Sequence, residues 1–156
     1  MAIDQKTVLF FDSSCLIAAA GSPTGGSSLL LAICARGSLR GAVSHAVLAE
    51  AEGNILTNLR PPALTRYRQE ILAIPLCFAP VPSTTERETV APITGDKDAH
   101  VAASAISVGA PFLITLDKRL ASRINESELS IHALSPGEFI TTKLPTHPAY
   151  RLIRGR

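Results

Sequence analysis

Short apolar runs alternate along the chain with longer stretches of helical periodicity, and this alternation constrains the fold more than any other feature. The first run, VLFF at residues 8–11, is continuously apolar, as in a strand buried on both faces of a parallel sheet. Parallel strands are joined by crossovers, which are usually helices. The pattern therefore predicts an α/β fold of right-handed βαβ units, with a central mostly parallel sheet covered by helices.

The same reasoning places the other elements. Further strands are predicted at residues 41–43, in LCFAPV, at 112–115 and at 130–133. Helices are predicted at 13–20, in SSLLLAICARG with Ser27 or Ser28 as N-cap, at 45–56, 63–74 and 98–108, and as a turn in SPGEFI. Prolines and polar residues predict mostly loop between 82 and 95. In such sheets function lies at the carboxyl ends of the strands, so the residues directly after each strand are the first candidates.

A chain of 156 residues fits one domain, which we expect at residues 1–143, followed by a C-terminal tail at 144–156. The charged fraction of 18% lies below the typical value of about 25%. We therefore expect some apolar surface to be buried against a partner, which can be a second copy of the chain in a homodimer. The three widely spaced cysteines suit free thiols in a reducing cytoplasm. No signal-peptide pattern and no membrane span is recognised, so we expect a cytoplasmic protein without a membrane partner.

Four carboxylates occupy related positions. Asp12 and Asp117 each follow a predicted strand, Asp98 opens a predicted helix, and Glu50 lies within the helix after the strand at 41–43. Taken singly, each aspartate is more simply a helix N-cap. Together they would repel one another and raise one another's pKa, which a bound cation relieves. Oxygen ligands alone suit Mg²⁺ or Mn²⁺, which keep open positions for phosphates.

Four blocks in order, VLFFDSSCLIAA, SHAVLAEAEGNI, GDKDAHVAASAISVGAPFLITLDKRL and LSPGEFI, resemble the PIN-domain family of metal-dependent nucleases, which includes bacterial toxin ribonucleases. The resemblance implies a three-layer α/β/α domain and a Mg²⁺- or Mn²⁺-dependent endoribonuclease that hydrolyses RNA phosphodiester bonds. It implies catalytic roles for Asp12, Glu50, Asp98 and Asp117, with metal ligation by the three aspartates. An antitoxin partner is a further implication.

The resemblance also implies supporting residues. Ser13 stands beside the first acid, and the Thr115 hydroxyl would orient a carboxylate or a metal-bound water, although an ordinary strand threonine is an equal reading. Asp96 competes with Asp98 for the third acidic position and is otherwise a loop cap or an outer-shell helper. Glu52 competes with Glu50, because Glu52 lies nearer the apolar face of its predicted helix.

Other chemistries are less well supported. The loop GSPTGGSS has Ser27 where a phosphate-binding loop needs lysine, so we interpret it as a flexible connection. The four histidines have no ligand spacing and are expected in surface or capping positions. A net charge of only +2 gives no general attraction to nucleic acid, so RNA binding depends on local arginines or bound cations. The alternative functions are a catalytically silent nucleic-acid-binding or assembly module and a small-molecule phosphohydrolase.

Overall fold

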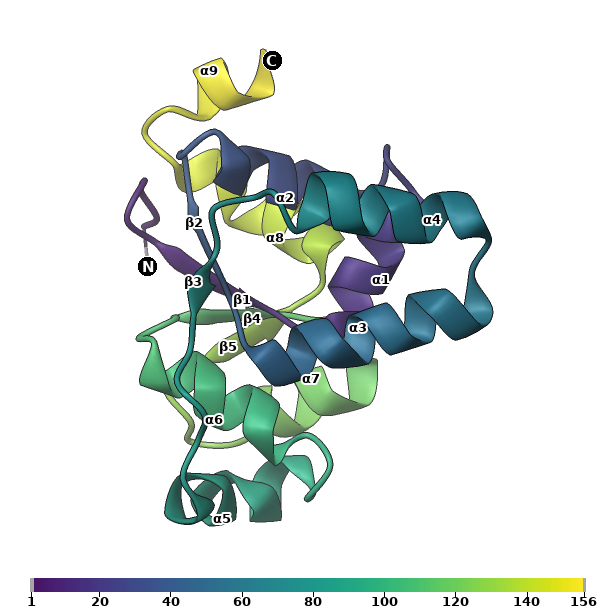
Figure 1. Ribbon diagram of the computed structural model, residues 1–156. Coiled ribbons are helices and arrows are strands. Elements are labelled where there is room, and N and C mark those ends of the chain that lie inside the picture. The colour runs from purple at the N-terminus through teal and green to yellow at the C-terminus, as the bar shows by residue number, and fades with distance from the viewer. Residues whose placement is uncertain (1, 156) are drawn as a thin grey trace.

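A five-stranded parallel sheet forms the centre of the molecule, in the order β3-β2-β1-β4-β5 (Figure 1). The structure is a computed structural model and describes residues 2–155. The strands are β1 (Val8–Phe11), β2 (Arg40–Val43), β3 (Cys77–Phe78), β4 (Phe112–Ile114) and β5 (His132–Leu134). The predicted strands are therefore confirmed, with boundaries shifted by one to three residues, the largest shift being the early end of β3.

Helices cover both faces of the sheet. One layer contains α1 (Ser13–Gly21), α2 (Gly26–Ala35), α3 (His45–Asn58), α4 (Pro61–Arg66) and α8 (Pro136–Thr142) (Figure 1). The other contains α5 (Thr84–Thr94), α6 (Ala99–Ser107) and α7 (Lys118–Asn125). The helical stretch expected at 63–74 is divided, because α4 gives way to a π-helical turn, η1 (Tyr67–Ile71). This arrangement confirms the three-layer α/β/α prediction.

Two local predictions are wrong. Residues 82–95 are not mostly loop, because α5 begins with a capping box in which Ser83 and Glu86 each bond the other's backbone N–H. Helix α2 is not capped by Ser27 or Ser28, since Gly25 is its N-cap residue and no side chain bonds there. The Ser28 hydroxyl instead donates to the carbonyls of Ala19 and Ser22, which closes the turn between α1 and α2.

The segment expected as a tail packs against the domain. It forms a 3₁₀ turn, η2 (Leu144–Thr146), and α9 (Tyr150–Arg154). Leu144 and Ile153 are buried, and the buried His147 ring places Nε2 2.7 Å from the Ser38 carbonyl oxygen. Because Ser38 precedes β2, this segment lies at the amino end of that strand.

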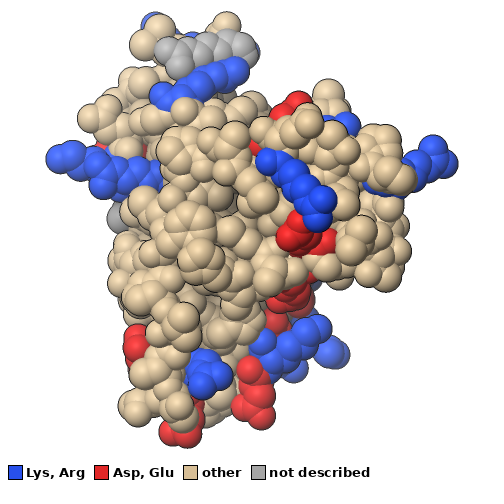
Figure 2. All heavy atoms as spheres, viewed as in Figure 1, with Lys and Arg blue, Asp and Glu red and all other residues tan. Residues whose placement is uncertain are grey.

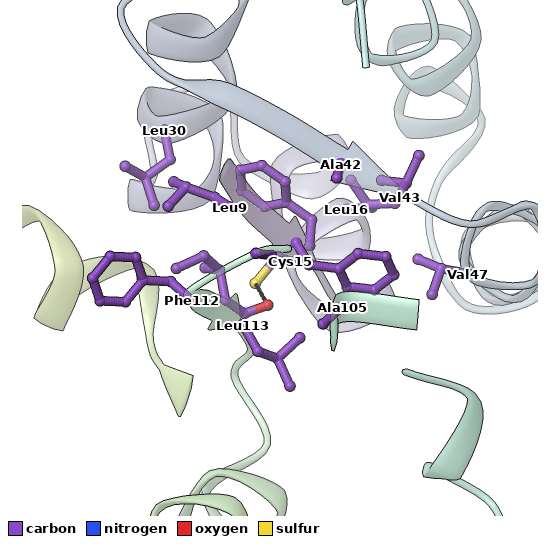
Figure 3. Close-up of a cluster of buried hydrophobic side chains, with 14 of the residues drawn as sticks. Leu9, Cys15, Leu16, Leu30, Ala42, Val43, Val47, Ala105, Phe112 and Leu113 are labelled. Carbon is purple, nitrogen blue, oxygen red and sulfur yellow. Dashed lines mark hydrogen bonds between the residues drawn. The ribbon is translucent and has the colours of Figure 1, made fainter. Parts of the chain in front are cut away.

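The core lies between the sheet and both helical layers (Figure 3). Leu9, Phe10 and Phe11 of β1 are fully buried, as the continuous apolar run predicted. The Cys15 thiol donates to the Ile114 carbonyl at 3.3 Å, the dashed contact in Figure 3. All three cysteines are free, as expected. No single helix within residues 2–155 has both the length and the apolar character to cross a bilayer, and the apolar pair α1 and α2 is bent by 101°.

Two glycines give opposite stability predictions. A Cβ at Gly41 in β2 would stand 2.6 Å from Leu76 Cδ2 and 3.3 Å from Phe11 Cε2, so Gly41→Ala forces repacking and should destabilise the fold by about 1–3 kcal/mol. Nothing lies within 4 Å of the corresponding position at Gly53, an exposed interior residue of α3, so Gly53→Ala should stabilise by about 1 kcal/mol. Urea unfolding of both variants measures this, and equal effects of one sign would contradict the packing described for β2.

Candidate active site

The acidic edge, defined as Asp12, Glu50, Asp98 and Asp117, lies beyond the carboxyl ends of the central strands. The chain passes from β1 outward to β2 and β3, then returns beneath the sheet to β4 on the other side of β1. Strands β1 and β4 therefore flank the point where the winding reverses, which is where ligands bind in sheets of this kind. Asp12 directly follows β1, and the loop after β4 carries Thr115 and Asp117.

Asp12 is held by a dense set of hydrogen bonds. Its Oδ1 accepts the Ser13 backbone N–H at 2.8 Å, which makes Asp12 the N-cap of α1. Its Oδ2 accepts the Thr115 hydroxyl at 2.8 Å and the Ser14 hydroxyl at 3.0 Å. Burial nevertheless raises the pKa of Asp12, against the lowering effect of these hydrogen bonds, and the nearby Glu50 carboxylate raises it further.

Ser14 and Thr115 connect the start of α1 to the loop after β4. The Thr115 hydroxyl accepts the Asp117 backbone N–H, and the Ser14 hydroxyl accepts the Leu116 backbone N–H, both at 3.0 Å. The expectation that Thr115 orients a carboxylate agrees with this geometry. Sequence reasoning did not include Ser14 among the supporting residues, although its place two residues after Asp12 at a helix start is a signal for such a bond.

Glu50 reaches the edge from α3. Its Oε1 accepts the Ser13 hydroxyl at 3.1 Å, which places Glu50 beside Asp12. Glu52 lies elsewhere, because its Oε1 is 2.7 Å from Arg68 Nε in the single close ion pair among residues 2–155. Packing of α3 on α1 turns Glu50 and not Glu52 toward the acidic edge.

Asp98 stands at the N-cap position of α6, yet its side chain makes no capping hydrogen bond. Its pKa is raised first by partial burial, then by the charges of Asp12, Asp117 and Glu50, while Lys97 acts in the opposite direction. Asp96 is exposed and lines a shallow cavity of about 260 Å³ with Thr84 and Arg87 of α5. Of the two competing aspartates, the structure therefore brings Asp98 to the other acids.

Asp117 has a structural role that it shares with Asp12. Its Oδ1 accepts the backbone N–H groups of Arg119 and Leu120 at 3.0 Å, so it caps α7. Helix capping therefore explains some of the hydrogen bonds of Asp12 and Asp117, but it does not explain the position of the Asp98 side chain. Figure 2 shows acidic side chains in a column down the middle of one face of the molecule, with basic side chains above and below them.

The acidic edge fits a hard divalent cation in donor type and in charge. All four side chains offer carboxylate oxygens, and none is in a close ion pair. In the described range 2–155, however, no three acidic, histidine or cysteine side chains stand close enough together to hold a metal ion as they are placed. The residues thus supply suitable ligands in an open arrangement.

The protein is thus a doubly wound α/β domain with carboxylates at its switch point, the place between β1 and β4 where the winding reverses. The chain belongs to the PIN-domain family, since the family's sequence profile, described as PIN domain, matches residues 8–119. No curated protein is significantly similar in sequence.

Solved structures share this fold. PAE2754 from Pyrobaculum aerophilum superposes with a TM-score of 0.63 at 18% identity, over 97% of this chain and 99% of that one. VapBC2 from Rickettsia felis, bound to a DNA fragment from its promoter, has a TM-score of 0.63 at 14% identity, and the match covers 83% of this chain and 98% of that one. VapBC-1 from nontypeable Haemophilus influenzae has a TM-score of 0.56 at 16% identity, and the match covers 84% of this chain and 99% of that one.

The Thr115 hydroxyl should matter for stability before any ligand binds. Thr115→Val keeps the shape but leaves the buried Asp12 carboxylate and the Asp117 N–H each short of a partner, so we expect a loss of about 1–3 kcal/mol. The matched control is Thr57→Val on α3, where an exposed hydroxyl donates only to the Gly53 carbonyl and the change should be within about 0.5 kcal/mol. Equal denaturation midpoints for the two variants would show that Thr115 is an ordinary strand residue.

Proposed function

We propose that this protein is a Mg²⁺- or Mn²⁺-dependent endoribonuclease that acts in the cytoplasm on single-stranded RNA. The observation that carries the proposal is the convergence of four unpaired carboxylates at the switch point, one of which, Asp98, has no capping role. Membership of the PIN-domain family makes a nuclease the expected use of such an edge.

The energetics of Asp12 support a cation there. The pKa of Asp12 is higher in the folded protein than in the unfolded chain. The fold therefore loses stability as the pH rises from the unfolded-state pKa to the folded-state pKa, because the proton leaves the unfolded chain first. Above that window the ionised Asp12 carries a desolvation cost, to which Glu50 adds repulsion. A bound divalent ion would offset both the desolvation cost and the repulsion, so the buried Asp12 carboxylate is suited to bind a cation.

Each residue then has a distinct role. Asp12, Asp98 and Asp117 would hold the metal, which supplies charge stabilisation at the scissile phosphate and lowers the pKa of a bound water. The Ser14 and Thr115 hydroxyls fix the Asp12 carboxylate, and the Ser13 hydroxyl fixes Glu50 Oε1. Glu50 would position the attacking water, being exposed and bonded to only one hydroxyl. The family resemblance adds an antitoxin as partner, and two of the similar structures are VapBC proteins.

Cleavage of a short single-stranded RNA tests the activity directly. With millimolar Mn²⁺ or Mg²⁺ the wild type should cut, and Asp98→Asn should lose more than the roughly 10- to 100-fold that removal of an outer-shell partner costs. Asp96→Asn and Glu52→Gln are matched controls, since both acids lie outside the acidic edge and should leave the rate near wild type. Metal-independent cleavage, or equal losses in all three variants, would refute the assignment.

Metal binding is measurable without a substrate. An ion at 100 times its Kd stabilises the folded state by about 2.7 kcal/mol, which raises the Tm by roughly 5–10 °C for a chain of this size. Asp98→Asn should abolish this shift and leave the metal-free protein no less stable, because the Asp98 side chain caps nothing and adds to repulsion. A metal-free Asp98→Asn protein with a lowered Tm, or no shift in the wild type, would favour a structural role for the acids and a silent binding module.

A further inference from the structure

One aromatic pair stands exposed at the same end of the sheet as the acids. Of the five phenylalanines, Phe10, Phe11, Phe112 and Phe139 are at most 2% exposed, whereas Phe78 at the end of β3 is 50% exposed. The His45 ring at the start of α3 stacks on Phe78, with centroids 4.7 Å apart and ring planes at 24°. His45 is itself exposed, so the pair presents a preformed aromatic surface to solvent.

The strand register fixes where this pair lies. Phe78 is opposite Val43 on β2, and Phe10 is opposite Ala42, so Phe11 is level with Val43 and Phe78. Asp12 follows Phe11 directly. Because neighbouring strands are about 4.8 Å apart, the Phe78 backbone lies about 10 Å from β1 along the same edge of the sheet. A chain whose phosphate lies at Asp12 can therefore bring a neighbouring base onto the aromatic pair.

The surroundings argue against the addition of a partner strand at this edge. Strand β3 is two residues long, and Pro75, Pro80 and Pro82 flank it. Short edge strands and prolines prevent a second chain from adding to a sheet. What remains open is the face of the ring stack, and stacking on aromatic rings is how proteins hold unpaired bases without reading their sequence.

We infer that His45 and Phe78 form a stacking platform for a nucleobase of single-stranded RNA, next to the phosphate held at the acidic edge. This inference rests on the proposed function for its ligand and extends it to the positioning of the substrate. The platform binds the base and leaves the cleavage chemistry to the carboxylates. It accepts any base, since every base has a π face.

The test measures binding in Mg²⁺ with every protein carrying Glu50→Gln, which by the roles proposed above keeps the metal ligands and removes the group that positions the attacking water. The probes are a short single-stranded RNA and the same oligonucleotide made with abasic nucleotides. Phe78→Leu keeps an apolar side chain without a ring, and should weaken binding of the RNA roughly 5- to 150-fold, the loss typical for one stacked base. Binding of the abasic probe should not change. Leu152→Ala is the control, since Leu152 is 68% exposed on α9, in the segment at the amino end of β2.

A second variant reports stacking directly. The chain contains no tryptophan, so Phe78→Trp introduces a single indole fluorophore. Its emission should be quenched by the RNA and not by the abasic probe. An unquenched signal on bound RNA, an equal effect of Phe78→Leu on both probes, or no RNA binding by the protein that keeps Phe78 each overturns the inference.

The two proposals fail separately. Base-dependent quenching without metal-dependent cleavage would leave the platform in place and refute the nuclease. If cleavage needs Asp98 but the Phe78→Leu variant binds and cuts the RNA as well as the wild type does, the nuclease proposal stands and the stacking platform is refuted. If Phe78→Leu instead changes the sedimentation of the protein and leaves RNA binding intact, the ring pair is a protein contact and the inference is wrong.

Discussion

The buried Asp12 carboxylate is the constraint around which the site is arranged. It sits where β1 ends, almost inaccessible to water, and its pKa is raised by that burial. Two hydroxyls and a backbone N–H hold its oxygens in place, and these come from the start of α1 and from the loop after β4. A charge that is desolvated and yet hydrogen-bonded in one orientation is preorganised, because it needs no further rearrangement to meet a cation. The same bonds fasten the loop that carries Asp117, so the geometry of the site depends on the stability of this corner of the fold.

The acidic edge draws on both helical layers. Glu50 comes from α3, which packs on α1, whereas Asp98 opens α6 on the other side of the sheet. Only the reversal of winding between β1 and β4 brings the two layers to one place. Substitutions in the core that shift one layer against the other should therefore affect the site even where they touch none of its residues. Phe78 extends the same edge outward along β2 and β3, so one row of strand ends carries both charge and aromatic surface.

The sequence predicted the parts of the structure that depend on local patterns. Each apolar run became a parallel strand because burial on both faces leaves no polar alternation, and the acids after β1 and β4 follow from that. The helix at α5 was missed because prolines outweighed the capping box of Ser83 and Glu86, which was present in the sequence. The choice between Glu50 and Glu52 needed the packing of α3 on α1, since both lie near the border of the helical face. The stack of His45 on Phe78 joins residues 33 positions apart and has no local signature.

Capping and metal binding are often set against each other as explanations for an aspartate at a strand end, but in this fold the two roles are geometrically compatible. Oδ1 of Asp12 and Oδ1 of Asp117 accept helix N–H groups, and this fixes each carboxylate at the edge. An ionised carboxylate has about four acceptor sites, so one or two capping bonds leave others for a ligand. The helix ends also offset part of the negative charge that the cluster accumulates. Asp98 also stands at a helix start but accepts no capping bond there, and Lys97 acts on its pKa against the three neighbouring acids. A cation at the edge would therefore favour the ionised form of Asp98.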